Sequence, residues 1–233
     1  MKVVILGDGL LGKELHKQTN WHFISRKTHE NMDFADESSY LGYLNEFDVI
    51  VNCIAHTDTY GEDKEIHWNT NYKAVSRLCD YCNDNDKKLV HISTDYVYAN
   101  CTNIPAESDI PVHQETWYAY TKLLGDAYIE LKDRKYLIIR GSHKVKPFPY
   151  TKAYANVSGS FDYVDVMAKQ IKFLVMRDCK GIYNIGTKNK SLFMLAQQTS
   201  SDVHAAIAPD HIPTKLEMNI EKLNNKINEK TIL

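Results

Sequence analysis

Short apolar runs alternate with longer amphipathic stretches over the first 140 residues of this 233-residue chain. The runs predict strands at residues 2–6, 21–25, 48–52, 88–92 and 136–140. The stretches between them predict helices near residues 10–17, 65–83 and 115–131. Several runs are apolar at consecutive positions, as in strands that are covered on both faces. The pattern therefore predicts an α/β fold, a doubly wound parallel sheet with helices on both sides.

The pattern loosens after Arg140. Residues 142–149 form a turn-rich, basic stretch, which predicts a loop leaving the carboxyl end of a strand. Beyond it we predict a helix at 162–175, a strand at 181–185 and helices at 192–200 and 219–225. No linker separates these elements from the first part. We expect a sheet domain at 1–142 and a small interleaved C-terminal lobe at 143–233, with residues 160–186 returning to the sheet.

Composition narrows the class of protein only slightly. The net charge of −2 gives no reason to expect nucleic acid, and the first apolar run stops at Gly7, too early for a membrane span. We expect a cytoplasmic protein with reduced thiols. Cys79 and Cys82 form a C-x-x-C inside a helical pattern, which favours a buried helix face over metal or redox use. The ten histidines show no metal-ligand spacing, so no metal site is predicted.

A glycine-rich turn follows the first predicted strand. It has the form G-x-G-x-x-G and opens the first predicted helix, where a dinucleotide pyrophosphate meets bare backbone and a helix amino terminus. A plain strand-to-helix turn is the alternative. The cofactor-binding residues predicted here are Gly7, Gly9, Leu10, Leu11 and Gly12.

The second strand ends in Ser25 and Arg26, with no acidic residue to bind a ribose 2′-hydroxyl. Basic groups at this position suit a 2′-phosphate, so NADPH is favoured over NADH, although a solvated charge cluster is an alternative. Asp33 and Phe34 are candidates for the adenine side. A capping aspartate beside a core phenylalanine explains them equally well.

The third predicted strand ends at the same edge of the sheet. Its backbone could pass along the cofactor at Cys53, Ala55 and His56. Asn71 lies in the helical stretch that follows, where a solvated polar position is the simplest interpretation.

Tyr118 and Lys122 are four residues apart, so a phenol and an ammonium share one helix face. We expect the ammonium to lower the pKa of Tyr118 from about 10, which would make the phenol a usable general acid. A surface helix is the alternative. Thr94 lies at the end of the fourth strand, where its hydroxyl could hydrogen-bond a substrate carbonyl, or simply cap the strand end.

These motifs together resemble the extended short-chain dehydrogenase/reductases, whose fold is of the Rossmann type. The closest likeness is to the dTDP-4-dehydrorhamnose reductase family, and the string Ser93-Thr94-Asp95-Tyr96-Val97-Tyr98 is its most specific part. Matches at residues 52–55, 71, 160–165 and 181–186 extend the likeness over nearly the whole chain.

The resemblance implies roles for individual residues. Tyr118 would be the general acid, and Lys122 would hold the nicotinamide ribose and the pKa of Tyr118. Thr94 would polarise the ketone, and Asn71 would support the helix of Lys122 through a water. The residues implied to bind substrate are Thr94, Asp95, Tyr96, His143 and Lys146.

The implied reaction is hydride transfer from NADPH to the 4-keto carbon of a nucleotide-linked 6-deoxyhexose, in deoxysugar biosynthesis. The resemblance also implies a homodimer, with the helices near residues 65–83 and 115–131 as its interface. Residues 1–142 would bind NADP, and 143–233 would be a reduced substrate-binding part.

The chain departs from its relatives in three places. The glycine turn is one residue shorter than G-x-x-G-x-x-G, His143 stands where an aromatic substrate contact is common, and the segment between Arg140 and Ser160 is shortened. Two other functions stay open. One is a bifunctional 3,5-epimerase/4-reductase, although Asp95 replaces the cysteine usual in those enzymes. The other is a non-catalytic regulatory subunit that binds NADP or a nucleotide sugar.

Overall fold

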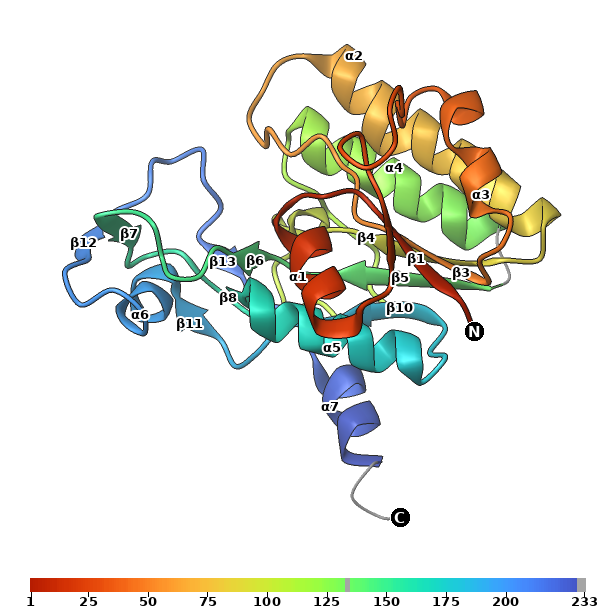
Figure 1. Cartoon of the computed structure of the whole chain (residues 1–233). Helices are drawn as coiled ribbons and strands as arrows, with labels where there is room; N and C mark the ends of the chain where they lie inside the picture. The colour runs from red at the N-terminus through yellow and green to blue at the C-terminus, as the bar shows by residue number, and fades with distance from the viewer. Residues whose placement is uncertain (133–134, 230–233) are drawn as a thin grey trace.

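The computed structural model describes residues 1–132 and 135–229, and its centre is a six-stranded parallel sheet (Figure 1). The strand order across the sheet is β10-β5-β4-β3-β1-β2, and every neighbouring pair is parallel. The strands are β1 (Val3–Leu6), β2 (His22–Ile24), β3 (Val49–Asn52), β4 (Lys88–Ile92), β5 (Tyr136–Arg140) and β10 (Gly181–Asn184).

Helices cover both faces of this sheet, because its strands are apolar on both sides. On one face Val3 and Ile5 of β1 pack in a core with α1 (Leu10–Thr19) and α5 (Val164–Met176). On the other face the alternate residues of β1 pack with α3 (Ala74–Asp84) and α4 (Trp117–Lys132) (Figure 1). The predicted doubly wound α/β fold is confirmed.

The predicted helix at 65–83 is divided into three parts. It begins as α2 (Lys64–His67), widens into the π-helical segment η3 (Trp68–Lys73) and continues as α3. π-Helical turns are rare and occur mostly at functional sites. The predicted helix at 162–175 begins later than expected, because Asp162 and Tyr163 form the short strand β9 before α5 starts.

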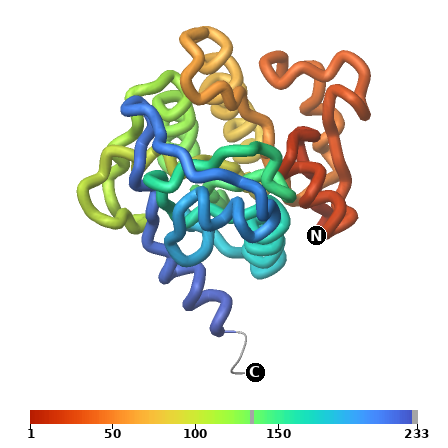
Figure 2. Tube along the Cα trace, turned by 90° about the vertical axis from the view of Figure 1, so that its left-hand side faces the viewer, coloured from red at the N-terminus to blue at the C-terminus, as the bar shows by residue number. Residues whose placement is uncertain are grey.

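The later chain forms a small lobe beside the sheet. In Figure 2 the segment after residue 200 crosses in front of residues 143–160, and two strand pairings join these segments. These two are β12 (His204–Ala206) with β7 (Lys152–Tyr154) and β13 (Lys215–Leu216) with β8 (Ser158–Gly159). Two further short pairs are β11 (Lys190–Ser191) with β8 and β6 (His143–Lys144) with β9 (Asp162–Tyr163).

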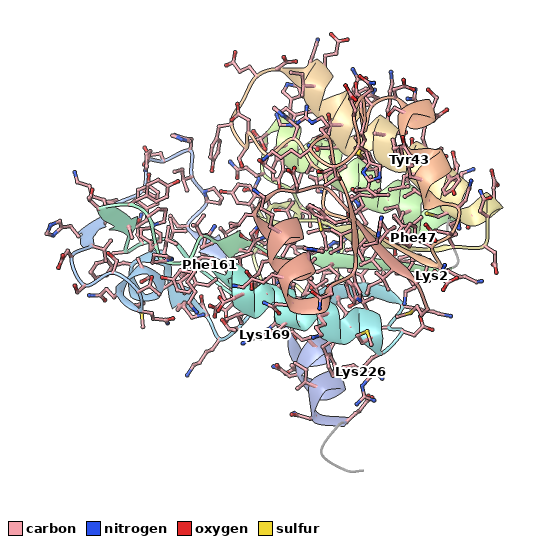
Figure 3. The ribbon with its side chains drawn as sticks, in the orientation of Figure 1. Lys2, Tyr43, Phe47, Phe161, Lys169 and Lys226 are labelled. Atoms are coloured by element: carbon pink, nitrogen blue, oxygen red, sulfur yellow. The ribbon has the colours of Figure 1, made fainter. Side chains whose placement is uncertain are left out.

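The small lobe has a core of its own. Phe161, labelled in Figure 3, is 1% exposed and belongs to this core with Phe148, Leu195 of α6 (Leu192–Gln197) and Leu216. The last helix, α7 (Glu221–Asn228), returns to the sheet and contacts β10. The interleaving arises because α5 and β10 lie between the two segments that build the lobe.

Short 3₁₀ turns complete the structure: η1 (Glu37–Ser39), η2 (Leu41–Leu44) and η4 (Asp95–Tyr98). Cys79 and Cys82 are both fully buried on α3, in agreement with the predicted buried helix face. Within residues 1–132 and 135–229, no helix has the length and apolar character needed to cross a membrane.

Candidate active site

The site lies where β1 and β3 leave the sheet side by side. The chain builds outward from β1 to β2 on one side and then crosses to β3 on the other, so their carboxyl ends diverge and open a crevice. Gly7 ends β1 with φ of +99°, which favours glycine. A Cβ on Gly12 would lie 2.0 Å from the carbonyl oxygen of Gly7, so only glycine allows α1 to start this close to the strand.

Two adjoining cavities follow this edge, of about 380 and 450 Å³. They are continuous, because Gly9, Cys53 and Ala55 line both. The first is also lined by the predicted cofactor residues Gly7, Ser25, Arg26, Asp33, Phe34 and His56. The second is also lined by Leu10, Leu11, Gly12, Thr94, Tyr118, Lys122 and His143. The structure thus brings the glycine turn and the predicted catalytic residues to one groove.

Asp33 and Phe34 serve the local fold as well as the first cavity. The Asp33 carboxylate accepts a hydrogen bond from the Ala35 N–H at 2.9 Å, and Phe34 is 6% exposed and packs on Tyr40. Both interpretations of this pair are therefore compatible with the geometry. Lys27, next to Arg26, forms an ion pair with Asp8 at 3.4 Å, so part of this charge is already compensated.

Lys122 points into the protein. Its side chain is 1% exposed, and its Nζ lies 2.6 Å from the carbonyl oxygen of Ile92 and 3.1 Å from Nε2 of His91. Burial lowers the pKa of Lys122 from 10.5 to about 8, against the raising influence of Asp126 and Cys53. The lysine is therefore close to losing its proton at mildly alkaline pH.

The expected depression of the pKa of Tyr118 is wrong for this structure. Burial raises that pKa to about 12, and although a hydrogen bond with Thr94 lowers it, burial dominates. The physical reason is the orientation of Lys122, whose Nζ is engaged by Ile92 and His91. Tyr118 consequently holds its proton, which is the state that a general acid needs.

Thr94 begins the 3₁₀ turn that follows β4. Its Oγ1 accepts a hydrogen bond from the N–H of Tyr96 at 3.2 Å and lies 3.2 Å from Oδ1 of Asp95. This turn holds the hydroxyl in the lining of the second cavity, where it hydrogen-bonds Tyr118. Asp95 is only 1% exposed, and its burial raises the pKa of its carboxyl group.

The other predicted substrate residues differ in position. The hydroxyl of Tyr96 hydrogen-bonds that of Tyr60 at 3.0 Å, and its ring lies edge-on to Tyr118. His143 lines the second cavity, where burial lowers its pKa to about 4 and keeps it neutral. Lys146 lines neither cavity, because its ammonium is paired with Asp165 at 2.6 Å.

Asn71 is fully buried, so the interpretation as a solvated polar position is wrong. Its amide and the backbone of His56 exchange two hydrogen bonds, at 2.8 and 3.0 Å. Nδ2 of Asn71 also donates to Oγ1 of Thr121, one residue before Lys122, at 3.3 Å. Asn71 therefore ties the loop after β3 to α4, and the π-helical segment is where this connection is made.

Sequence reasoning gave no role to several residues around the groove. Thr57, Thr59 and Ser142 line the second cavity. His91 and Asp126 are fully buried beside Lys122. Thr57, Thr59 and Ser142 follow strand ends, where single polar residues are common, and His91 lies within β4. Asp126 had a signal that could have been used, because it is four residues after Lys122 on α4 and therefore shares its helix face.

Comparisons with known proteins place the chain in a family and a fold class. A family model described as the RmlD substrate binding domain matches residues 1–172. A dTDP-4-dehydrorhamnose reductase of Mycolicibacterium smegmatis is 31% identical over 144 residues, 59% of this chain and 44% of the relative. The reductase of Salmonella typhimurium with the same name is 33% identical over 97 residues, 41% of this chain and 32% of the relative. The matched parts thus span less than half of either relative.

Solved structures show the same fold. A dTDP-4-dehydrorhamnose reductase from Clostridium acetobutylicum superimposes with a TM-score of 0.82 and 21% identity, covering 99% of this chain and 93% of the other. The reductase from Bacillus anthracis, solved in complex with NADP, has the same TM-score and identity and covers 97% and 93%. At this identity the likeness establishes the Rossmann-type architecture.

Proposed function

The chain belongs to the family defined by the RmlD substrate-binding domain, and we propose that it uses NADPH to reduce the 4-keto group of a nucleotide-linked 4-keto-6-deoxyhexose. One observation carries the proposal. Thr94, which caps η4, lines one cavity with Tyr118 and Lys122 of α4, and this cavity continues into the cavity at the glycine turn. A carbonyl in the second cavity would therefore lie next to a hydroxyl, a protonated phenol and an amine.

The residues of the groove fit a dinucleotide. No side chain or backbone atom lies within 4 Å of a Cβ built on Gly9, so the space in front of the turn is open where α1 presents its first N–H groups. Arg26 lines the first cavity, where its guanidinium would suit a 2′-phosphate, and Lys122 lines the second, where it would hold a ribose. Bound NADPH would supply the hydride.

The chain itself supplies the proton. Reduction turns the ketone oxygen into an alkoxide, which the hydroxyl of Thr94 stabilises through a hydrogen bond. Tyr118, protonated because burial keeps its pKa high, donates its proton to this oxygen. His143 stays neutral beside the substrate and adds no competing charge.

The substrate class is supported by the named functions of the relatives. Two are dTDP-4-dehydrorhamnose reductases, and a third, from Bacillus subtilis, is a spore coat polysaccharide biosynthesis protein that is 30% identical over 149 residues. The nucleotide itself would bind between the sheet and the small lobe, where Tyr60 and Tyr96 border the site.

A reductase assay with matched tyrosine variants tests the proposal. Purified protein is given NADPH and a panel of 4-keto-6-deoxy nucleotide sugars, and NADPH absorbance is followed. Tyr118→Phe should lower kcat by about 10²–10⁴-fold because the general acid is lost. Tyr120→Phe is the control, since Tyr120 lies on the outer side of α4 against Trp117 and should keep nearly full activity.

Other outcomes of this assay identify the alternatives. Tight NADPH binding without turnover of any sugar would identify a binding protein and refute the reductase. Solvent deuterium at C3 or C5 of the product would identify an epimerase as well. Asp95 lines neither of the two cavities, which argues against its carboxylate as the base for that step.

We further propose that the protein is a cytoplasmic homodimer whose interface includes α4 and the π-helical segment. Trp68, Tyr72 and Tyr128 form a partly exposed row of rings on this face, with centroids 4.9 and 6.3 Å apart. Sedimentation equilibrium should show a dimer that Tyr72→Asp dissociates. Tyr43→Asp, at an exposed tyrosine of η2 that is labelled in Figure 3, should leave it intact. A monomeric wild-type protein would refute this.

A further inference from the structure

A buried hydrogen-bonded chain lies behind Lys122 and has no part in the proposed proton transfer. His91 of β4 is fully buried between Asn52 of β3 and Lys122 of α4. Its Nδ1 is 3.3 Å from Nδ2 of Asn52, and its Nε2 is 3.1 Å from Nζ of Lys122. The imidazole therefore bridges the strand that ends at the cofactor groove and the lysine that lines it.

The backbone fixes the orientation of the Asn52 amide. Oδ1 of Asn52 accepts a hydrogen bond from the N–H of Ile54 at 3.0 Å, and a backbone N–H can only donate. The amide must therefore present its NH₂ group to His91. Since this NH₂ group is also a donor, Nδ1 of His91 must accept, and the proton of the neutral imidazole must be on Nε2.

This tautomer places an N–H against Nζ of Lys122. A lysine amine can accept this hydrogen bond, whereas an ammonium has three donors and no acceptor. The carbonyl oxygen of Ile92 accepts from Lys122 in either state. When Lys122 is neutral, every donor in the Ile54–Asn52–His91 chain therefore has an acceptor. When Lys122 is charged, the Nε2–H of His91 faces the ammonium, and both groups are donors.

The charged groups around this chain favour the charged form of Lys122, against the preference of the chain for the neutral form. Asp126, on the same helix as Lys122, has its Oδ1 3.9 Å from Nε2 of His91, and it raises the pKa of the lysine. The other oxygen of Asp126 accepts hydrogen bonds from Ser93 at 2.8 Å and from Arg140 at 3.0 Å, and these compensate much of the negative charge of the carboxylate. Cys53 also raises the pKa of Lys122. Arg140 donates a further hydrogen bond to the hydroxyl of Tyr98. Burial and Lys122 keep His91 itself neutral, with a pKa well below 6.5.

We propose that His91 is a positioning residue for the reduction proposed above, on which this inference rests: held by Asn52 with its proton on Nε2, it fixes Nζ of Lys122 beside the groove and opposes the charged state of that lysine. Lys122 can then exchange a proton at mildly alkaline pH, which would let it return a proton to Tyr118 after each reduction. His91 does this without touching substrate or cofactor.

The tautomer of His91 can be measured without any activity. Long-range ¹H–¹⁵N NMR spectra of protein labelled at histidine distinguish a proton on Nε2 from one on Nδ1. The expected result at pH 7.5 is the Nε2–H tautomer. In Asn52→Asp a carboxylate oxygen would accept from Nδ1, so the tautomer should switch. A doubly protonated ring or an Nδ1–H tautomer in the wild-type protein would overturn the proposal.

The effect on Lys122 is measured by the pH dependence of NADPH binding, followed by NADPH fluorescence. Wild-type binding should weaken as pH rises through about 8, where Lys122 loses its charge. In His91→Gln the amide oxygen can accept from the ammonium, so the midpoint should rise by about one pH unit, a tenfold change in the ionisation constant. Asn52→Asp should shift it in the same direction.

His22→Gln is the control, because His22 is exposed on the edge strand β2 and its midpoint should match the wild type. A midpoint unchanged in both His91→Gln and Asn52→Asp would overturn the proposal, even if both variants bind NADPH. Failure of the reductase proposal looks different. The protein would then turn over no sugar, while the tautomer and the binding midpoint would still report on His91.

Discussion

Burial affects the two central residues of the site in opposite ways. It raises the pKa of Tyr118 to about 12 and lowers that of Lys122 to about 8, because the interior disfavours the charged form of either group. The phenol is therefore kept as an acid. The lysine is left close to neutrality, with His91, the Ile92 carbonyl and Asp126 deciding its charge.

Replacing Lys122 should change how stability depends on pH. A lysine whose pKa falls from 10.5 in the unfolded chain to about 8 in the fold destabilises the protein while charged. This cost is present below pH 8 and disappears as pH rises towards 10.5. Relative to wild type, Lys122→Met should therefore gain about 1–3 kcal/mol at pH 7, an advantage that shrinks at pH 10.

Urea unfolding of both proteins at pH 7 and pH 10 measures this difference. Lys13→Met is the control, since Lys13 is exposed on α1 and its removal should leave the pH dependence unaltered. An equal stability difference at the two pH values would contradict the assignment of a depressed pKa to Lys122.

The parts of the site that depend on residues close together in sequence could be predicted, and the parts that depend on residues far apart in sequence could not. Tyr118 and Lys122 are related by helix periodicity, so their pairing on one face could be predicted. The orientation of Lys122 could not, because it depends on His91, a residue 31 positions earlier on a neighbouring strand. Asn71 was misinterpreted for the same reason, since its partners His56 and Thr121 are distant in sequence.

At the scale of the elements, the turn from β1 to α1 has glycine at two positions for two different reasons. At Gly12 the demand is packing, because a Cβ would meet the Gly7 carbonyl oxygen at 2.0 Å. At Gly9 a Cβ would meet no atom of the described residues within 4 Å, so packing does not require glycine there. In the proposed function, the open space in front of Gly9 is where the cofactor pyrophosphate would bind.

The two glycines should respond differently to substitution by alanine. Gly12→Ala should destabilise the fold by about 1–3 kcal/mol through overpacking, and weaken NADPH binding as well. Gly9→Ala should leave the unfolding free energy nearly unchanged, since its φ of −65° suits alanine, but weaken NADPH binding at least tenfold. Thermal unfolding and NADPH titration of both variants measure this. Equal unfolding temperatures for the two would show that Gly12 is not a packing requirement.

At the scale of the whole molecule, the last described helix packs against the edge of the sheet. Helix α7 packs on the edge strand β10 through Leu223, which is fully buried, while Lys222 donates to the Ile182 carbonyl at 2.7 Å. Asn184 at the end of β10 also donates to the Asn219 carbonyl at 3.1 Å. The small lobe is thereby held to the sheet at the point where the chain leaves it.

Removing the apolar contact of α7 should destabilise the whole domain. Leu223→Ala should lower the unfolding free energy by about 2–5 kcal/mol, the range for buried leucines. Ile227→Ala on the same helix is the control, because Ile227 is 37% exposed and its truncation should cost about 0.5–1 kcal/mol. Two separate unfolding transitions in Leu223→Ala, with the sheet unaffected, would contradict the expectation that α7 and the sheet unfold together as one cooperative unit.

The sheet could be predicted more fully than the lobe. The strands at 88–92 and 136–140 coincide with β4 and β5, because buried parallel strands have an unmistakable apolar pattern. The lobe consists of strands of two or three residues such as β8 and β13, too short to show any periodicity. Its pairings join residues far apart in sequence, and local pattern carries no information about them.

The π-helical segment at residues 68–73 restricts where relatives can gain or lose residues. A wider turn contains one residue more than an α-helix needs, and each residue adds roughly 100° of rotation. Loss of one residue here would turn α2 away from α4 and separate Asn71 from His56 and Thr121. Insertions and deletions among relatives should therefore be found in the loop at 57–62 and be absent from 68–73.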